Sequence, residues 1–187
     1  AFEGEIIRRG DMQVEFDGSR VDCCELVQTK DASEVEDHKI ELIGPDIDEF
    51  EVGSKHSIAY VVEVAGKSMQ PDFEPVFERK FHSYLNCIEG VMHTGQRDMI
   101  RIRVSKEAFN AGFRAKHFGE VLYAQVKNEF EAVVDKCQVK IYTNPEDCTK
   151  IRHEIAIPVF DKRDERLSTM TDESVPVYYS CIMCQAF

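Results

Sequence analysis

The chain has 187 residues, of which 43% are hydrophobic and 31% charged, and its formal net charge is -12. This length and composition are typical of a globular chain with one well-packed domain, or with one domain and part of a second. The negative charge argues against nucleic acid or an anionic membrane as a partner, and no apolar run is long enough to span a bilayer.

The cysteines indicate a reducing, cytoplasmic environment, because their number is odd and their spacing is not that of a disulfide framework. We expect most of them to be small buried apolar residues and set apart only the last two. The seven are Cys23, Cys24, Cys87, Cys137, Cys148, Cys181 and Cys184. The N-terminus carries no signal-peptide pattern, and we expect the chain to continue at both ends in a longer protein.

The N-terminal part is predicted to be rich in strands. Residues 12–16 alternate with period two, an Asp-Gly hairpin signal follows, and residues 24–27 are expected to be the returning strand. Residues 39–43 alternate again, and the acidic run 46–51 is expected to be a solvated connection.

The apolar, β-branched run 58–64 predicts a buried strand. The Ala-Gly-Lys-Ser sequence that follows resembles the end of a nucleotide-binding phosphate loop. That motif needs a glycine where Val61 stands, inside the strand, so we exclude a phosphate loop.

Residues 71–89 predict an amphipathic helix, with Pro71 in its first turn and Gly90 as its left-handed stop. Its apolar side chains fall on one stripe, which we expect to pack in the core. They are Phe73, Val76, Phe77, Phe81, Tyr84, Leu85 and Ile88.

A basic stretch follows in this acidic chain. A loop that carries His93, Gln96 and Arg97 is expected to lead into a strand at 99–104, with its arginines on the face opposite the core. Residues 97–116 contain six basic and two acidic side chains, a local balance of +4. Two interpretations stay open: a binding site for a phosphate-bearing ligand, or a solvated strand face paired with acids from elsewhere.

Further helices and strands alternate towards the C-terminus. We expect a short helix capped by Ser105 and ended by Gly112, then a longer helix, and then another strand. The apolar face of the longer helix consists of Phe118, Val121, Leu122, Val126 and Phe130. The alternating residues of the strand are Cys137, Val139 and Ile141.

A helix is expected to start at Asn144 and to break or kink at Pro158, with a helical piece at 161–167 beyond it. The predicted fold class is α+β or α/β, a layered mixed sheet with packed helices and a β-rich N-terminal part. The alternation of strands and helices over 58–167 indicates one layered domain.

Cys181 and Cys184 form a Cys-x-x-Cys pair, which can hold one metal or iron–sulfur cluster or form a redox disulfide. Taken alone, the pair is also compatible with a stand-alone redox or zinc-binding module. A third interpretation is an acidic interaction domain without a site.

Five stretches together resemble acetyl-CoA synthase of the carbon monoxide dehydrogenase/acetyl-CoA synthase system. They cover nearly the whole chain in family order, and the chain resembles the family's middle domain plus the opening of its metal-bearing domain. The stretches are EGEIIRRGDMQVEF, ASEVEDHKIELIGPDID, VVEVAGKSMQPDFEPVFERKFH, HTGQRDMIRIRVSKEAF and YYSCIMCQAF.

The resemblance implies an acyltransferase that makes acetyl-CoA from CO, a corrinoid-bound methyl group and coenzyme A on a nickel/iron–sulfur cluster. It implies that Cys181 and Cys184 are two ligands of a [4Fe–4S] cluster bridged to nickel. Carbon monoxide dehydrogenase and a corrinoid iron–sulfur protein would be partners of the parent enzyme. We expect none of the 187 residues of this chain to be catalytic.

The resemblance also implies that the middle domain binds coenzyme A through its arginine-rich surface. The candidate residues are Met92, Gln96, Arg97, Arg101 and Arg103. Relatives commonly carry tryptophan where Met92 stands, and this chain has no tryptophan. Met92 could offer an adenine ring only a softer apolar contact.

Overall fold

The computed structural model describes residues 7, 11–17 and 22–171, which form two four-stranded mixed sheets with helices packed around them. The first sheet has the order β4 (Ser54–His56), β1 (Met12–Asp17), β7 (Met99–Ser105), β6 (Val91–Gln96). The second has the order β2 (Cys23–Thr29), β5 (Ile58–Ala65), β8 (Lys136–Tyr142), β3 (Lys39–Ile43). The predicted layered α+β class, with its β-rich N-terminal part, is confirmed.

The predicted strands exist, but the predicted hairpin between the first two is wrong. β1 pairs with β4 and antiparallel to β7, whereas β2 lies in the other sheet and pairs with β5. The register explains the choice of partner, because Glu15 lies opposite Arg103 and Asp17 lies opposite Arg101. Opposite charges on facing residues of an antiparallel pair stabilise that pairing.

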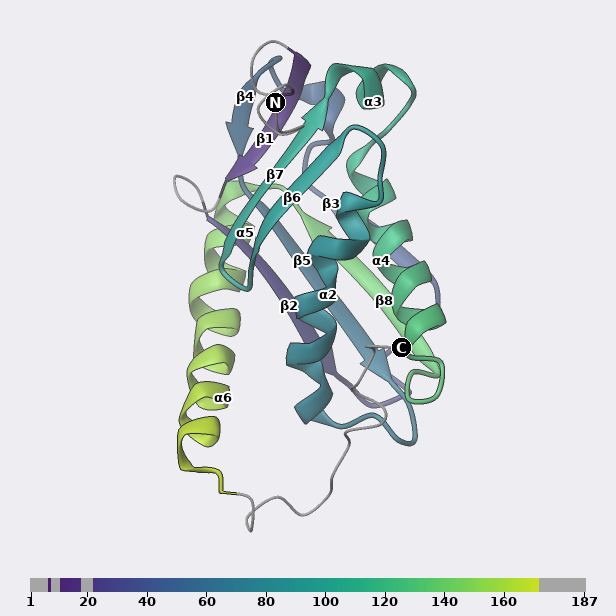
Figure 1. Cartoon of the computed structure of the whole chain (residues 1–187), viewed down its shortest axis with the longest axis vertical. Helices are drawn as coiled ribbons and strands as arrows, with labels where there is room; N and C mark the ends of the chain where they lie inside the picture. Colours follow the sequence, from purple (N-terminus) through teal and green to yellow (C-terminus); the bar gives the residue numbers. More distant parts are fainter. Residues whose placement is uncertain (1–6, 8–10, 18–21, 172–187) are drawn as a thin grey trace.

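The second sheet is buried on both faces, so its central strands are continuously apolar. Every residue of β5 is buried. One face packs against the first sheet, α2 (Glu74–Asn86) and α4 (Ala115–Glu129). The other face packs against a C-terminal helical run through residues such as Leu26, Val61 and Ile151. Figure 1 shows this arrangement, with α2 and α4 in front of the sheet.

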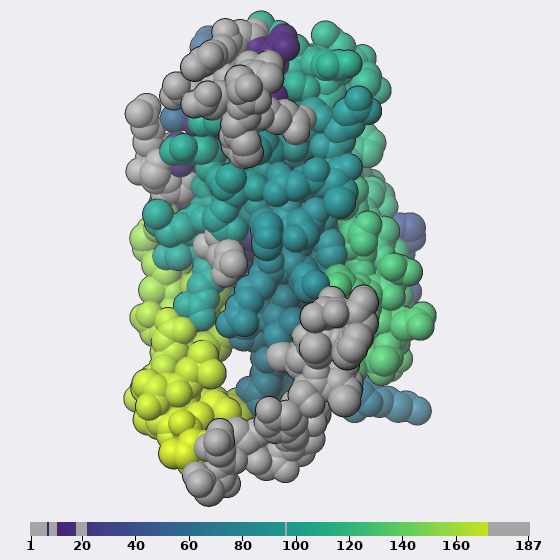
Figure 2. Space-filling model, viewed as in Figure 1, coloured from purple at the N-terminus to yellow at the C-terminus, as the bar shows by residue number. Residues whose placement is uncertain are grey.

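The predicted helix at 71–89 is confirmed in register and ends three residues early. A 3₁₀ turn, η3 (Pro71–Phe73), leads into α2. The central side chains of the stripe are buried, and Phe77 stacks on Phe130 with ring centroids 4.0 Å apart. Figure 2 shows α2 in the middle of this face of the molecule, between α6 (Ile157–Thr169) and α4.

The acidic run at 46–51 is more than a solvated connection. It contains a 3₁₀ turn, η2 (Ile47–Glu49), with Ile47 fully buried. The Asp46 carboxylate accepts hydrogen bonds from the backbone N–H of Ile47 and, at 2.8 Å, of Ala115. It therefore ties this segment to the N-terminus of α4, which has unsatisfied N–H groups to offer.

Ser105 caps α3 (Lys106–Asn110) as expected, because its hydroxyl accepts from the backbone N–H of Ala108. The chain is also helical from Pro145 as expected, but it does not break at Pro158. α5 (Pro145–Lys150) continues into a π-helical segment, η4 (Ile151–Ala156), and then into α6 (Ile157–Thr169). Pro158 thus lies inside a continuous helical run, directly after its π-helical segment, and irregular hydrogen bonding of this kind is how a helix accommodates the N–H that proline lacks.

The edge of β2 is closed by side chains from two helices. Carboxylates of α2 accept from its backbone N–H groups, Glu78 from Val27 at 3.0 Å and Glu74 from Thr29 at 2.8 Å. Arg163 of α6 donates to both carboxylates and to the carbonyl of Val27. An edge strand that would otherwise expose backbone groups is thereby covered, and α6 is fixed beside α2.

None of the helices in the described part of the chain is both long enough and apolar enough to cross a membrane.

Candidate functional site

The basic stretch forms a β-hairpin. The predicted loop is therefore wrong for His93 and Gln96, which lie on a strand, and holds for Arg97, which lies in the turn. β6 and β7 pair from Val91 to Gln96, which leaves a two-residue turn of Arg97 and Asp98. Gly95 permits the tight approach of the two strands, because its φ is +99° and a Cβ atom there would lie 1.8 Å from the carbonyl oxygen of Met99.

Two of the candidate arginines lie on the outer face of the first sheet and are paired with acids. Arg101 donates through Nε and Nη2 to Asp17, at 3.3 and 3.0 Å. Arg103 donates to Glu15. Lys55 bridges both carboxylates, at 2.7 Å from Glu15 and 3.3 Å from Asp17. For these residues the expected pairing with acids is confirmed, but the face is not the solvated one that was expected, because Glu15, Asp17 and Arg103 are buried.

The carboxylates of this network are deeply buried, with side-chain exposure of 1% for Glu15 and 2% for Asp17. Burial acts to raise the pKa of Glu15, but hydrogen bonds from Lys55 and Arg103 outweigh it and lower the pKa overall. Glu15 is therefore held as a charged carboxylate that depends on its cationic partners.

Met92 lies beside Arg103, since the two residues face each other across β6 and β7. Its side chain is buried. The backbone of Gln96 pairs with Met99, while its side chain lies outside the described structure. Cys181 and Cys184 also lie outside the described residues.

Arg97 differs from the other two arginines because its partner is exposed. Its Nη1 and Nη2 atoms donate to the two oxygens of Asp164 on α6, at 3.0 and 2.9 Å. Its guanidinium carbon lies 5.1 Å from the centre of the Phe160 ring. The Asp164 side chain is 56% exposed, against 29% for Arg97.

The backbone of Arg97 is held independently of this ion pair. Its φ is +57°, a left-handed conformation that few residues other than glycine adopt. Its carbonyl accepts from the backbone N–H of Glu25 at 2.7 Å. Left-handed backbone at a non-glycine residue is strained and is often found at functional sites.

A buried polar cluster lies under the hairpin. His93 of β6 contacts Glu25 of β2 through Nε2, and both side chains have 0% exposure. Tyr60 lies opposite Glu25 on β5 and is fully buried. Among the described residues, His93 Nδ1, Glu25 Oε2 and Tyr60 Oη have no hydrogen-bond partner. The cluster links the two sheets and is sealed from solvent, so it is a poor candidate for ligand binding.

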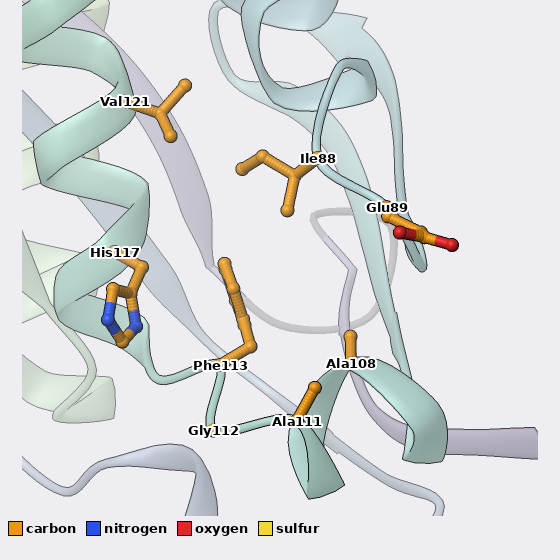
Figure 3. Close-up of a pocket in the computed structure, with 8 residues that line it drawn as sticks. All are labelled: Ile88, Glu89, Ala108, Ala111, Gly112, Phe113, His117 and Val121. Atoms are coloured by element: carbon orange, nitrogen blue, oxygen red, sulfur yellow. The ribbon is translucent and has the colours of Figure 1, made fainter.

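Two hollows open on the described surface. The larger, of about 350 Å³, is mainly apolar and lies between the C-terminal end of α2, α3 and the start of α4. In Figure 3 the rings of Phe113 and His117 line it, while the carboxylate of Glu89 points away from Phe113. The smaller, of about 170 Å³, lies at the hairpin beside Arg101, Thr94 and Gly95. Of these two, the smaller one contains a candidate arginine.

The described cysteines are free thiols, and four of the five are buried, as expected for small apolar residues. Burial raises the pKa of Cys23 and of Cys137 to about 12, so neither is a reactive thiolate. Within the described residues, no three metal-ligating side chains come together.

Sequence reasoning identified the arginines but missed their partners. Asp164 lies 67 positions from Arg97, and no periodicity connects the two. Glu15 and Asp17 left a signal, since they alternate with Val14 and Phe16 on a strand.

Comparison with protein families gives two matches along the chain. A model described as CO dehydrogenase/acetyl-CoA synthase complex beta subunit matches residues 1–148. A second model, which describes the C-terminal part of the ACS/CODH beta subunit, matches residues 160–187.

Similar curated proteins align with nearly the whole chain. The carbon monoxide dehydrogenase/acetyl-CoA synthase subunit alpha of Moorella thermoacetica is 49% identical over 187 residues, which are 100% of this chain and 26% of that protein. The acetyl-CoA decarbonylase/synthase complex subunit beta 2 of Methanocaldococcus jannaschii is 46% identical, over 99% of this chain and 38% of the relative. The acetyl-CoA decarbonylase/synthase complex subunit beta of Methanopyrus kandleri is 44% identical, over 99% of this chain and 39% of the relative. The chain thus spans a quarter to two fifths of these relatives, and the matches leave the stand-alone redox or zinc module without support.

Proposed function

The chain belongs to the CO dehydrogenase/acetyl-CoA synthase complex beta subunit family, and we propose that it is the coenzyme A-binding segment of an acetyl-CoA synthase. The parent enzyme would join CO, a methyl group from a corrinoid iron–sulfur protein and coenzyme A. Carbon monoxide dehydrogenase and the corrinoid protein would be its partners. The names of the relatives support this proposal, since each is a subunit of an acetyl-CoA synthase or decarbonylase/synthase.

A nickel/iron–sulfur cluster would supply the carbon–carbon bond chemistry when bound. Thiolates are the ligands that iron–sulfur clusters take, so Cys181 and Cys184 suit two of its positions. The proposed division of the chain is a coenzyme A-binding domain at 1–167 and the start of the metal-cluster domain at 168–187. The task of the first is to hold a flexible polyanion so that its thiol is correctly placed.

The observation that carries the proposal is that Arg97 pairs with an exposed acid, whereas the acids paired with Arg101 and Arg103 are buried. Removing Arg103 from Glu15 would deprive a buried carboxylate of a cationic partner, which costs about 3–5 kcal/mol when a buried pair is broken. Arg97 can leave Asp164 cheaply, because Asp164 is exposed and water can solvate its charge. Among the candidate arginines, Arg97 is therefore the one best suited to bind a phosphate.

Arg101 can assist without leaving its partner. Its side chain is 41% exposed, and Asp17 uses only Nε and Nη2. The remaining Nη1 is available on the side chain that borders the hollow of about 170 Å³. Arg103, at 9% exposure, is better explained as the structural partner of Glu15.

Calorimetric titration of the 187-residue chain with coenzyme A tests this function. We expect binding that weakens as salt rises, and weaker binding of the 3′-dephospho analogue, because the arginines contact phosphate. A chain that does not bind coenzyme A, or binds both ligands equally whatever the salt, would contradict the proposal.

A further inference from the structure

We propose that Arg97 and Asp164 form a latch that a phosphate-bearing ligand opens. In the closed state Arg97 holds Asp164 and so ties the β6–β7 hairpin to α6. A phosphate that takes the guanidinium of Arg97 releases Asp164 and loosens α6. This inference rests on the proposed function, because it assigns a consequence to ligand binding at the same hairpin.

The closed latch is well defined geometrically. Both terminal nitrogens of Arg97 engage both oxygens of Asp164, at 3.0 and 2.9 Å, in the fork geometry that guanidinium also offers to phosphate. The ring of Phe160, one turn earlier on α6, lies 5.1 Å from the guanidinium carbon. The pKa of Asp164 is lowered, chiefly by its hydrogen bond with Arg97, as expected for a formed pair.

Arg97 can exchange partners without moving its backbone. The turn is fixed by the pairing of β6 with β7 and by the hydrogen bond from Glu25 N–H to the carbonyl of Arg97. Neither interaction involves α6. The guanidinium can therefore swing from Asp164 to a ligand while the hairpin keeps its place.

The same exchange is unfavourable at the other arginines. Asp164 is 56% exposed and water replaces Arg97 when it is released, whereas Glu15 is 1% exposed. An anion that competes for Arg103 must leave a buried carboxylate short of positive charge. Of the three arginine pairs, the Arg97 pair is the one whose opening a ligand can drive.

The latch loosens α6 without undocking it. Arg163 still binds Glu74 and Glu78, and Arg166 still binds Asp72 at the next turn. α6 overlaps the stretch matched by the second family model, residues 160–187, in which Cys181 and Cys184 lie. Ligand binding at the hairpin would thus reach the segment that leads to the proposed metal site.

The decisive variant is Asp164→Asn, which removes the competitor and leaves Arg97 intact. Linkage requires that, if ligand binding opens the latch, opening the latch strengthens ligand binding. We expect coenzyme A to bind about fivefold more tightly to Asp164→Asn, within the usual range of such couplings. Asp161→Asn is the matched control, since it removes the same charge from an exposed position on the same helix without an ion pair among the described residues.

Hydrogen exchange on α6 gives the second readout. In the wild-type chain, coenzyme A should raise the exchange of amides in 160–169. In Asp164→Asn their exchange should already be high and should not respond to the ligand. Equal affinity of Asp164→Asn and Asp161→Asn for coenzyme A, with α6 exchange unchanged by the ligand, would overturn the latch and leave the proposed function standing.

Sodium pyrophosphate, titrated in parallel, separates the two proposals. If coenzyme A does not bind the wild-type chain, the proposed function fails, and the latch is then judged on pyrophosphate alone. Tighter pyrophosphate binding by Asp164→Asn than by Asp161→Asn supports the latch. Equal pyrophosphate binding by the two variants overturns it.

Discussion

At the scale of the residue, three arginines from one short stretch have different roles because their partners differ in burial. Arg101 and Arg103 face buried acids of the neighbouring strand, whereas Arg97 holds an exposed aspartate on a distant helix. A carboxylate in the interior needs its cation, while a carboxylate at the surface has water as an alternative. The burial of the partner therefore decides which arginine a ligand can recruit.

We predict that Arg103→Gln lowers the free energy of unfolding by about 3 kcal/mol, because the buried Glu15 loses one of its two cationic partners and keeps Lys55. Arg97→Gln should lower it far less. Urea denaturation of both variants measures the difference. Equal losses in the two variants would show that burial of the partner does not set the role of these arginines.

The alternation of β1 predicts the acidic side of this ion-pair network but not its basic partners. Glu15 and Asp17 alternate with Val14 and Phe16, so their carboxylates share one face, as do Arg101 and Arg103 on β7. The sequence does not show that β1 pairs with β7, since the paired residues Glu15 and Arg103 are 88 positions apart. For the same reason the Asp-Gly signal suggested a local hairpin that the sheet pairing overrides.

At the scale of the element, the helices were predictable in register and the sheet pairings were not. The stripe of α2 follows from helical periodicity alone, and its central residues are buried. Of the hairpin at residues 91–105, the sequence predicts only β7, which alternates clearly. It favours a loop in place of β6, because Gly90 and Gly95 flank residues 91–94.

Phe77→Ala should lower the free energy of unfolding by about 3–5 kcal/mol through lost burial and the cavity left beside Phe130. The exposed Val52→Ala is a suitable comparison, with a small expected effect. Thermal melting of both variants checks this. A Phe77→Ala chain that melts within a degree of wild type would mean that the aromatic stack does not support the core.

The stability of the covered edge of β2 depends on pH through Glu78, whose carboxyl group accepts a hydrogen bond from Val27. Burial raises the pKa of Glu78 to about 7 from an ordinary value of 4.5, although Arg163 acts against the rise. The folded chain thus holds this proton more tightly than the unfolded chain. The contribution of Glu78 to stability is complete below about pH 4.5 and is lost as the pH rises through 7.

Glu78→Gln removes this titration. The free energy of unfolding of the variant, relative to that of the wild type, should therefore rise between about pH 5 and pH 8. We expect an improvement on the order of 1–2 kcal/mol. Urea denaturation at the two pH values gives the difference, with the exposed Glu165→Gln as the control. A difference that is constant with pH, or that favours wild type at the higher pH, would contradict the assignment to Glu78.

At the scale of the whole molecule, the second sheet separates two hydrophobic cores, and the helical run α5–η4–α6 connects the two parts matched by family models. The larger core lies between the sheets, α2 and α4, and the smaller lies under α5, η4 and α6. Phe160 and Arg163 fasten α6 to the part matched by the first model. A ligand site on the hairpin is therefore physically connected to the segment proposed to lead to the metal centre.

The affinity of Arg97→Gln for coenzyme A, measured by calorimetry beside the wild-type chain, tests the central claim most directly. Lys162→Gln on α6 is the control for the loss of one positive charge. We predict that Arg97→Gln binds roughly tenfold or more weakly, as expected when a charge-assisted contact worth about 1.5–3 kcal/mol is lost, while Lys162→Gln binds like wild type. An Arg97→Gln chain that is folded and binds coenzyme A as tightly as the wild-type chain would contradict the proposed role of Arg97.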